Sequence, residues 1–338
     1  MNSGVLSSLT DPAILFFVLG ISAGFVRSNL EIPPAIAKFL SLYLLMAIGF
    51  KGGQALADVG LSSEAMKALV AALVLAGVVP AWSFLILRKR INSFDAAAIA
   101  ATYGSVSVVT FIAASQFLAV EGEAPGGYMT VALVIRESPA IVMAVLLASW
   151  VRTREQTAPA GPSPVAMLDT QGAAPLSIRK VMHEALTDGA QMLLIGSFIV
   201  GAVSGDAGGA AMKPFVGGIF KGLLSFFLLE MGLLVARQLR EVRDVGPFLV
   251  GFALVMPVVN ASVALGGGRL LGLHVGDLTL LAVLAASASY IVVPAVVRYA
   301  IPEASPSRYF TMALAVTFPF NLIIGIPLYY SAARWLAG

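Results

Sequence analysis

The chain has 338 residues, of which 59% are hydrophobic and only 12% are charged. This composition excludes a water-soluble domain and indicates an integral membrane protein. The net charge of +3 does not call for a nucleic-acid partner, and the absence of cysteine excludes thiolate metal sites and disulfides.

Ten apolar stretches follow one another along the chain, and most are near the length needed to cross about 30 Å of hydrocarbon. They are apolar on all sides or carry Gly, Ala and Ser at helical spacing, which indicates packed membrane helices and not a β-barrel. We therefore predict an all-α integral membrane protein with ten transmembrane helices. The predicted spans are 12–26, 34–55, 66–87, 95–118, 126–151, 188–204, 214–236, 246–267, 277–299 and 308–335.

The second half of the sequence resembles the first at an offset of 181 to 184 residues. LLMAIGFKGGQAL aligns with FLLEMGLLVARQL, which pairs Gly49 with Gly232, and YMTVAL at Tyr128 aligns with YFTMAL at Tyr309. Because each copy contributes five spans, the second copy must enter the membrane from the opposite side, as in many secondary transporters. The predicted units are a first repeat over 1–151, a linker over 152–187 and a second repeat over 188–338.

Basic residues near the span ends are distributed asymmetrically, and such residues resist translocation across the membrane. If the N-terminus is outside, most of them, including Arg88, Lys89 and Arg90, fall in inner loops. We therefore predict a multi-pass protein of the bacterial inner membrane with both termini outside. The loop that carries Glu121 and Glu123 is then also outside.

The linker contains four prolines among Ala, Gly and Thr, a composition that disfavours packed structure in its middle. Between Ile178 and Leu186, apolar residues recur at helical spacing, which predicts a short interfacial helix. The segment is either a tether that lets two halves assemble or a docking element for a cytosolic regulator.

The fourth span has the features of an interrupted helix, whose exposed half-helix ends can hold ions. In ATYGSVSVVT, Gly104 weakens the helix. Ser105, Ser107 and Thr110 offer hydroxyl groups beside it.

The ninth span contains the matching tract AASASYIVVPA. Ser287 and Ser289 offer hydroxyl groups, and Pro294 removes a helical amide and disfavours helical geometry at Val293. Small residues also permit close helix packing, so either tract alone could be a contact face. Because the two tracts are counterparts in the repeat, we predict a pair of broken, crossing helices in spans 4 and 9.

Two charged residues, Arg136 and Glu137, lie in the middle of the fifth span. An uncompensated charge at the bilayer centre costs about 2.5–3.5 kcal/mol on the insertion scale, so such residues usually face a cavity or a partner. Glu137 is either a ligand for a coupling cation or part of a structural pair with Arg136 or a neighbouring backbone group. A direct bond between the two is strained, because adjacent helical residues do not face each other.

Several tracts resemble the sodium-dependent bicarbonate transporter family. They are IPEASPSRY at 301–309, IGFKGG at 48–53, KGLLSFFLLEMG at 221–232 and the pattern formed by Glu137, Pro139 and Ala140. The resemblance covers nearly the whole chain. It implies a gate domain from spans 1, 2, 6 and 7, a core domain from spans 3–5 and 8–10, a homotrimer and, in some members, a PII-like cytosolic regulator. Tyr290 stands where the family has an acidic residue.

Together these features predict a symporter that imports a small anion with sodium, and bicarbonate is the anion that the resemblance implies. The expected substrate-binding residues are Gly104, Ser105, Ser107, Ser289 and Tyr290. The expected cation-binding residues are Glu137, Thr110 and Ser287. The alternatives are a related permease for another organic or inorganic anion and a sodium/proton antiporter. We expect no enzymatic activity, since no HExxH motif occurs, and no cofactor other than sodium as the coupling ion.

Overall fold

The computed structural model describes residues 10–60, 62–157 and 189–337. Over these residues every regular element is a helix, and no strand occurs among them. Eight helices in this part of the chain are long and apolar enough to cross a membrane. Two shorter apolar helices, α2 (Pro12–Phe25) and α13 (Val275–Ala286), accompany them and correspond to the first and ninth predicted spans. The prediction of an all-helical membrane protein is therefore confirmed.

The remaining elements follow the predicted spans in chain order. They are α3 (Pro34–Val59), α4 (Ser63–Leu87), α5 (Ser93–Gly104), α6 (Val108–Val120), α7 (Tyr128–Thr157), α9 (Gly189–Lys213), α10 (Phe220–Gln238), α11 (Val242–Val245), α12 (Pro247–Leu270), α14 (Val292–Ala300), α15 (Pro306–Thr311), α16 (Phe318–Phe320) and α17 (Ile326–Ala337), with short helical turns η1 (Pro214–Gly218), η2 (Leu239–Glu241), η3 (Met312–Thr317) and η4 (Asn321–Gly325). The interfacial helix predicted between Ile178 and Leu186 lies outside the described residues.

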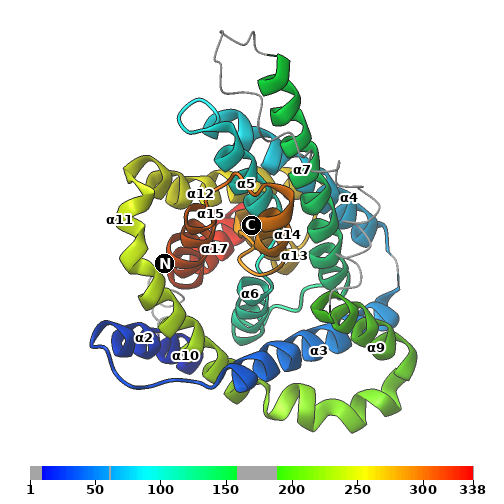
Figure 1. Cartoon of the computed structure of the whole chain (residues 1–338). Helices are drawn as coiled ribbons and strands as arrows, with labels where there is room; N and C mark the ends of the chain where they lie inside the picture. Colours follow the sequence, from blue (N-terminus) through cyan, green and yellow to red (C-terminus); the bar gives the residue numbers. More distant parts are fainter. Residues whose placement is uncertain (1–9, 61, 158–188, 338) are drawn as a thin grey trace, which may run out of the picture.

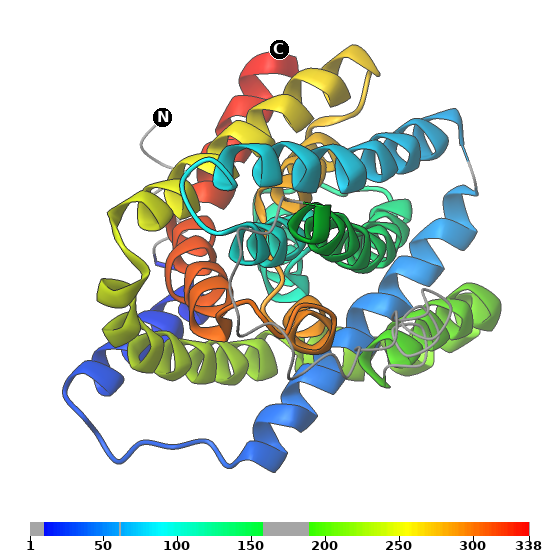
Figure 2. The same cartoon turned by 45° about the horizontal axis from the view of Figure 1, so that its top comes forward.

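Four helices, α2, α3, α9 and α10, lie along one edge of the bundle (Figures 1 and 2). α3 packs closely on α9, and α10 packs closely on α2. Glycines make both approaches possible: a Cβ added to Gly49 of α3 would lie 2.2 Å from Ser197 Oγ, and one added to Gly232 of α10 would lie 2.2 Å from Phe17 O. The two glycines that the repeat aligns thus occupy equivalent helix contacts.

The contact between α3 and α9 leads to a testable prediction about stability. A Cβ on Gly53 would lie 2.0 Å from Phe198 O and 2.8 Å from Ala202 N, which are backbone atoms that cannot rotate away. Gly53→Ala should therefore destabilise the protein by about 1–3 kcal/mol, the usual cost of overpacking. Thermal unfolding in detergent would measure the effect. Gly196→Ala on α9, where nothing lies within 4 Å, is the matched control and should leave the unfolding temperature nearly unchanged.

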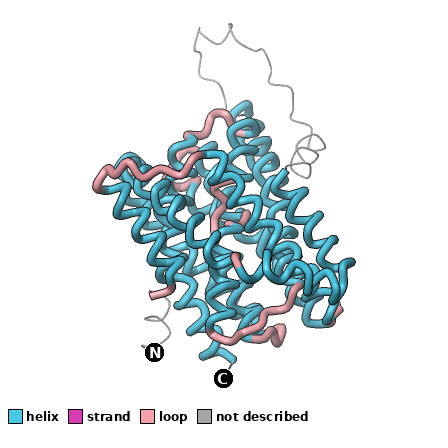
Figure 3. Tube along the Cα trace, turned by 90° about the horizontal axis from the view of Figure 1, so that it is seen from below, coloured by secondary structure: helices cyan, strands magenta, loops and turns pink. Residues whose placement is uncertain are grey.

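Both predicted helix breaks are present. α5 ends at Gly104 and α6 begins at Val108, and most residues on both sides of this break are buried. α13 ends at Ala286, and α14 begins at Val292. The two breaks contact each other, because Ser289 N donates to Thr102 O at 2.9 Å. Loop segments therefore run within the bundle as well as at its ends (Figure 3).

The cause of the second break differs from the predicted one. Pro294 lies in the first turn of α14, where its missing N–H has no intrahelical partner to lose. The chain instead leaves the helix at Ser287, whose backbone is extended with φ −82° and ψ 162°.

Buried aspartates near the two ends of the bundle link the halves of the chain. Asp95, at the start of α5, accepts hydrogen bonds from Ser305 N at 2.7 Å and from Arg308. Asp277, at the start of α13, accepts them from Gly126 N at 2.7 Å and from Tyr128 Oη at 2.5 Å. Each aspartate is therefore held by residues of the opposite half.

The loop between α14 and α15, which contacts Asp95 through Ser305 N, also contacts the C-terminal part of α7. Arg152 Nη2 lies 2.9 Å from Glu303 Oε2 and 2.9 Å from Ala300 O. Partial burial raises the pKa of Glu303, but the hydrogen bonds from Arg152 outweigh this effect and hold the pKa below its usual value.

The first and last described residues lie at the same end of the bundle (Figure 3).

Candidate functional site

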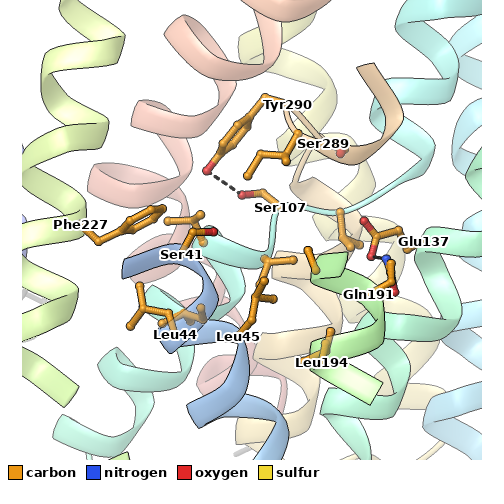
Figure 4. Close-up of a pocket in the computed structure, with 16 residues that line it drawn as sticks. Ser41, Leu44, Leu45, Ser107, Glu137, Gln191, Leu194, Phe227, Ser289 and Tyr290 are labelled. Carbon is orange, nitrogen blue, oxygen red and sulfur yellow. Dashed lines mark hydrogen bonds between the residues drawn. The ribbon is translucent and has the colours of Figure 1, made fainter. Parts of the chain in front are cut away.

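A cavity of about 50 Å³ lies beside the two helix breaks. Its wall combines both breaks with residues of α3, α7, α9 and α10, and most of the lining is apolar. Figure 4 shows the side chains that surround it. Its polar lining residues are Ser41, Ser107, Glu137, Gln191, Ser289 and Tyr290.

Ser107 organises the first break. Its Oγ accepts from Thr110 N at 3.2 Å, which caps the start of α6, and donates to Tyr290 Oη at 3.3 Å. Its backbone N–H donates to Ser287 Oγ at 3.1 Å. One residue of the first break is thus bonded to two residues of the second.

Ser289 organises the second break in a similar way. While its N–H reaches Thr102 O, its Oγ accepts from Val293 N at 3.4 Å in the first turn of α14. Val108 at the start of α6 and Ile291 just before α14 line the cavity. Two helix N-termini therefore face this space, and such ends carry a partial positive charge that favours an anion.

Glu137 lies beside Gln191 at one side of the cavity, and Phe227 lies at the other side (Figure 4). It is buried on α7, and its carboxylate accepts a hydrogen bond from Gln191 Nε2 of α9. A carboxylate oxygen is a suitable ligand for a hard cation. The cavity thus has a negative side and, at the two helix N-termini, a positive side.

The predicted substrate-binding residues are only partly brought together. Ser107, Ser289 and Tyr290 line the cavity. Gly104 and Ser105 do not; the Gly104 carbonyl accepts from Arg136, and Ser105 Oγ has no hydrogen-bond partner within the described chain.

The predicted cation-binding residues are also divided. Glu137 lines the cavity, whereas Ser287 and Thr110 lie behind its wall. Ser287 Oγ accepts a hydrogen bond from Ser107 N and donates one to Leu284 O, each at 3.1 Å. Thr110 Oγ1 is buried and finds no partner among the residues that the structure describes.

Two polar lining residues, Ser41 of α3 and Gln191 of α9, were missed by sequence reasoning. Gln191 is a polar amide within the apolar run of the sixth span, and this signal could have identified it. Ser41 is one serine among many in the spans and carries no such signal.

A second cavity, of about 460 Å³, begins where the first ends. Tyr290 and Ile291 line both cavities, and the larger one extends to Arg298 and Tyr309. Tyr290 therefore separates the small central cavity from a wider space toward the end of the bundle that carries Arg298.

The comparison with known proteins agrees with this geometry. No curated protein matches the chain. A family model described as the Na+-dependent bicarbonate transporter superfamily matches residues 12–334. This range includes both helix breaks and all eight helices that are long enough to cross a membrane, apart from the last residues of α17. The chain therefore belongs to the Na+-dependent bicarbonate transporter superfamily.

Proposed function

We propose that this protein imports bicarbonate together with sodium as a secondary active transporter. The observation that carries the proposal is the small cavity between Glu137 and the N-terminal ends of α6 and α14. It offers partial positive charge for an anion and a carboxylate for a cation within one small space.

The size of the cavity favours a small anion. A single water needs about 10–15 Å³ by the same kind of measure, so about 50 Å³ suits a solute of only a few heavy atoms. Hydroxyl groups at Ser41, Ser289 and Tyr290 can donate to oxyanion oxygens in this space. A larger organic acid would need a wider cavity. Tyr290 has the largest side chain of the lining residues, so its movement would widen the cavity most.

Charge arithmetic favours a coupling cation. An anion that enters a cell at about −100 mV meets an opposing term of roughly 2.3 kcal/mol. One accompanying sodium ion cancels this term and leaves the sodium gradient to drive uptake. We assign the cation to the carboxylate of Glu137, with Gln191 as its neighbour.

We further propose ten spans in two inverted repeats. Supporting this, Asp95 and Asp277 lie 182 residues apart and each accepts hydrogen bonds from the opposite half. The aligned residues Gly49 and Gly232 also make equivalent helix contacts. In this arrangement α2, α3, α9 and α10 form the gate domain, and the other helices form the core domain that moves against it. The homotrimer and the PII-like regulator are proposed on the family resemblance.

The orientation has its own test, which is clean because the chain has no native cysteine. With both termini outside, a cysteine at Ala124 should react with a membrane-impermeant maleimide on intact cells, whereas one at Lys89 should react only after permeabilisation. Both positions are exposed on the structure. The reverse labelling pattern would overturn the orientation.

Uptake into proteoliposomes tests the function directly. Labelled bicarbonate should accumulate with an inward sodium gradient and not with an equal potassium gradient. Uptake of another anion in preference to bicarbonate would replace the substrate, and sodium-driven proton movement without anion uptake would support an antiporter.

A further inference from the structure

Arg136 lies in the middle of α7. Among the described residues it has the largest fully buried side chain. Its Nη2 donates to Gly104 O at 3.3 Å, while Nε and Nη1 have no hydrogen-bond partner in the described part of the chain. Arginine keeps its proton in proteins. The core therefore contains a fixed positive charge at depth.

No carboxylate of the described residues forms an ion pair with this guanidinium. Glu137 is adjacent in sequence, but its side chain turns to Gln191 of α9 and to the cavity. Arg136 does not line the cavity, so the geometry does not make it a direct ligand of the anion. An intramembrane charge with neither an acidic partner nor a cavity calls for a functional explanation.

The position of the guanidinium suggests one. Gly104 is the last residue of α5, and the C-terminal end of a helix carries about half a negative elementary charge. In broken transporter helices such ends attract coupling cations. The equivalent residue of the second half is Ala286, at the end of α13. Its carbonyl oxygen accepts a hydrogen bond from Asn321 Nδ2 at 2.9 Å. One half-helix end is thus met by a cation and the other by a neutral amide.

We infer that Arg136 is a built-in counter-charge that takes the place of a coupling cation at the end of α5. The inference rests on the proposed sodium-coupled anion transport. The charges of Arg136 and Glu137 balance each other when the cavity is empty, and one sodium ion with one bicarbonate adds no net charge when it is loaded. Because charge is costly at the membrane centre, both forms can then cross it. Arg136 is in this sense a positioning residue that sets how many cations accompany each anion.

The test is the sodium stoichiometry of Arg136→Gln in proteoliposomes. Wild-type uptake should depend hyperbolically on sodium and be insensitive to membrane potential. Arg136→Gln leaves the α5 carbonyls and Glu137 without their counter-charge, so one further sodium should be needed per anion. Its sodium dependence should become sigmoidal, and an inside-negative potential should accelerate its uptake. Arg269→Gln, an exposed change of the same charge at the end of α12, should behave as wild type.

Arg136→Lys supplies a second measurement, which also serves if Arg136→Gln does not fold. A buried lysine loses its proton more readily than arginine. Its sodium dependence should therefore become sigmoidal as the pH is raised, while that of the wild type should not. Hyperbolic sodium dependence and insensitivity to potential in Arg136→Gln, or an Arg136→Lys curve that does not change with pH, would overturn the inference. Absence of sodium-driven uptake in the wild type would instead overturn the proposed function.

Discussion

Glu137→Gln should abolish the sodium dependence of bicarbonate uptake or raise the sodium concentration for half-maximal uptake by at least about tenfold. The reason is that the change removes the carboxylate from the cavity while it preserves the shape of the side chain. Hydrogen bonds and ligand contacts to charged groups are worth roughly 1.5–3 kcal/mol. Initial uptake rates at varied sodium and fixed bicarbonate would measure the effect.

Glu230→Gln is the matched control for this experiment. Glu230 is a buried carboxylate of α10 whose Oε2 has no hydrogen-bond partner among the described residues, and it does not line the cavity. This variant should keep the wild-type response to sodium. If Glu137→Gln is folded and responds to sodium as the wild type does, Glu137 has a structural role, and the cation lies elsewhere.

Tyr290→Asp should raise the bicarbonate concentration for half-maximal uptake by at least about tenfold, which corresponds to ~1.4 kcal/mol. Tyr290 lines the central cavity, receives the hydrogen bond of Ser107 and packs edge-on against Phe318 at 5.4 Å. An aspartate there would place a negative charge beside the helix N-termini to which we assign the anion, and like charges repel strongly away from water. Uptake measured at varied bicarbonate and fixed sodium is the relevant assay.

Tyr290→Asn separates the effect of charge from the loss of the ring, since asparagine matches aspartate in size. We expect it to weaken bicarbonate uptake less than Tyr290→Asp does. A different outcome would relocate the ions: if Tyr290→Asp increases the apparent affinity for sodium and leaves that for bicarbonate unchanged, Tyr290 stands at the cation site. The acidic residue that the family resemblance implies at this position would then correspond to a cation ligand.

The class of protein and the places of the helix breaks follow from local properties of the sequence. Long apolar runs can be stable only in a membrane, where the helix satisfies its own backbone groups. Gly104 weakens the helix at its own position, and the two tracts are counterparts in the repeat, so both breaks could be predicted without any tertiary contact. The proline used to predict the second break lies instead in the first turn of α14. The pairing of Gly49 with Gly232 was likewise readable from the repeat, although the partner helices were not.

The composition of the site depended on tertiary structure, because a broken helix does not indicate which of its faces meets the cavity. Ser107 and Ser105 are two residues apart, yet Ser107 lines the cavity and Ser105 lies behind it. Ser287 was predicted as a cation ligand, but it bonds to the Ser107 amide. Gln191 reaches Glu137 only because glycines let α9 pack closely on α3.

The different directions of the Arg136 and Glu137 side chains depend on both the sequence and the tertiary structure. Adjacent positions on a helix point in different directions, so the sequence alone excluded a good direct bond between them. Only the placement of α7 in the bundle decided that the carboxylate meets Gln191 of α9 at the cavity and that the guanidinium meets the end of α5. The sequence by itself therefore determined the membrane fold, the repeat and the helix breaks, whose causes are local. Tertiary structure alone decided which polar groups meet, because side chains from helices far apart in the chain converge only when the bundle is packed.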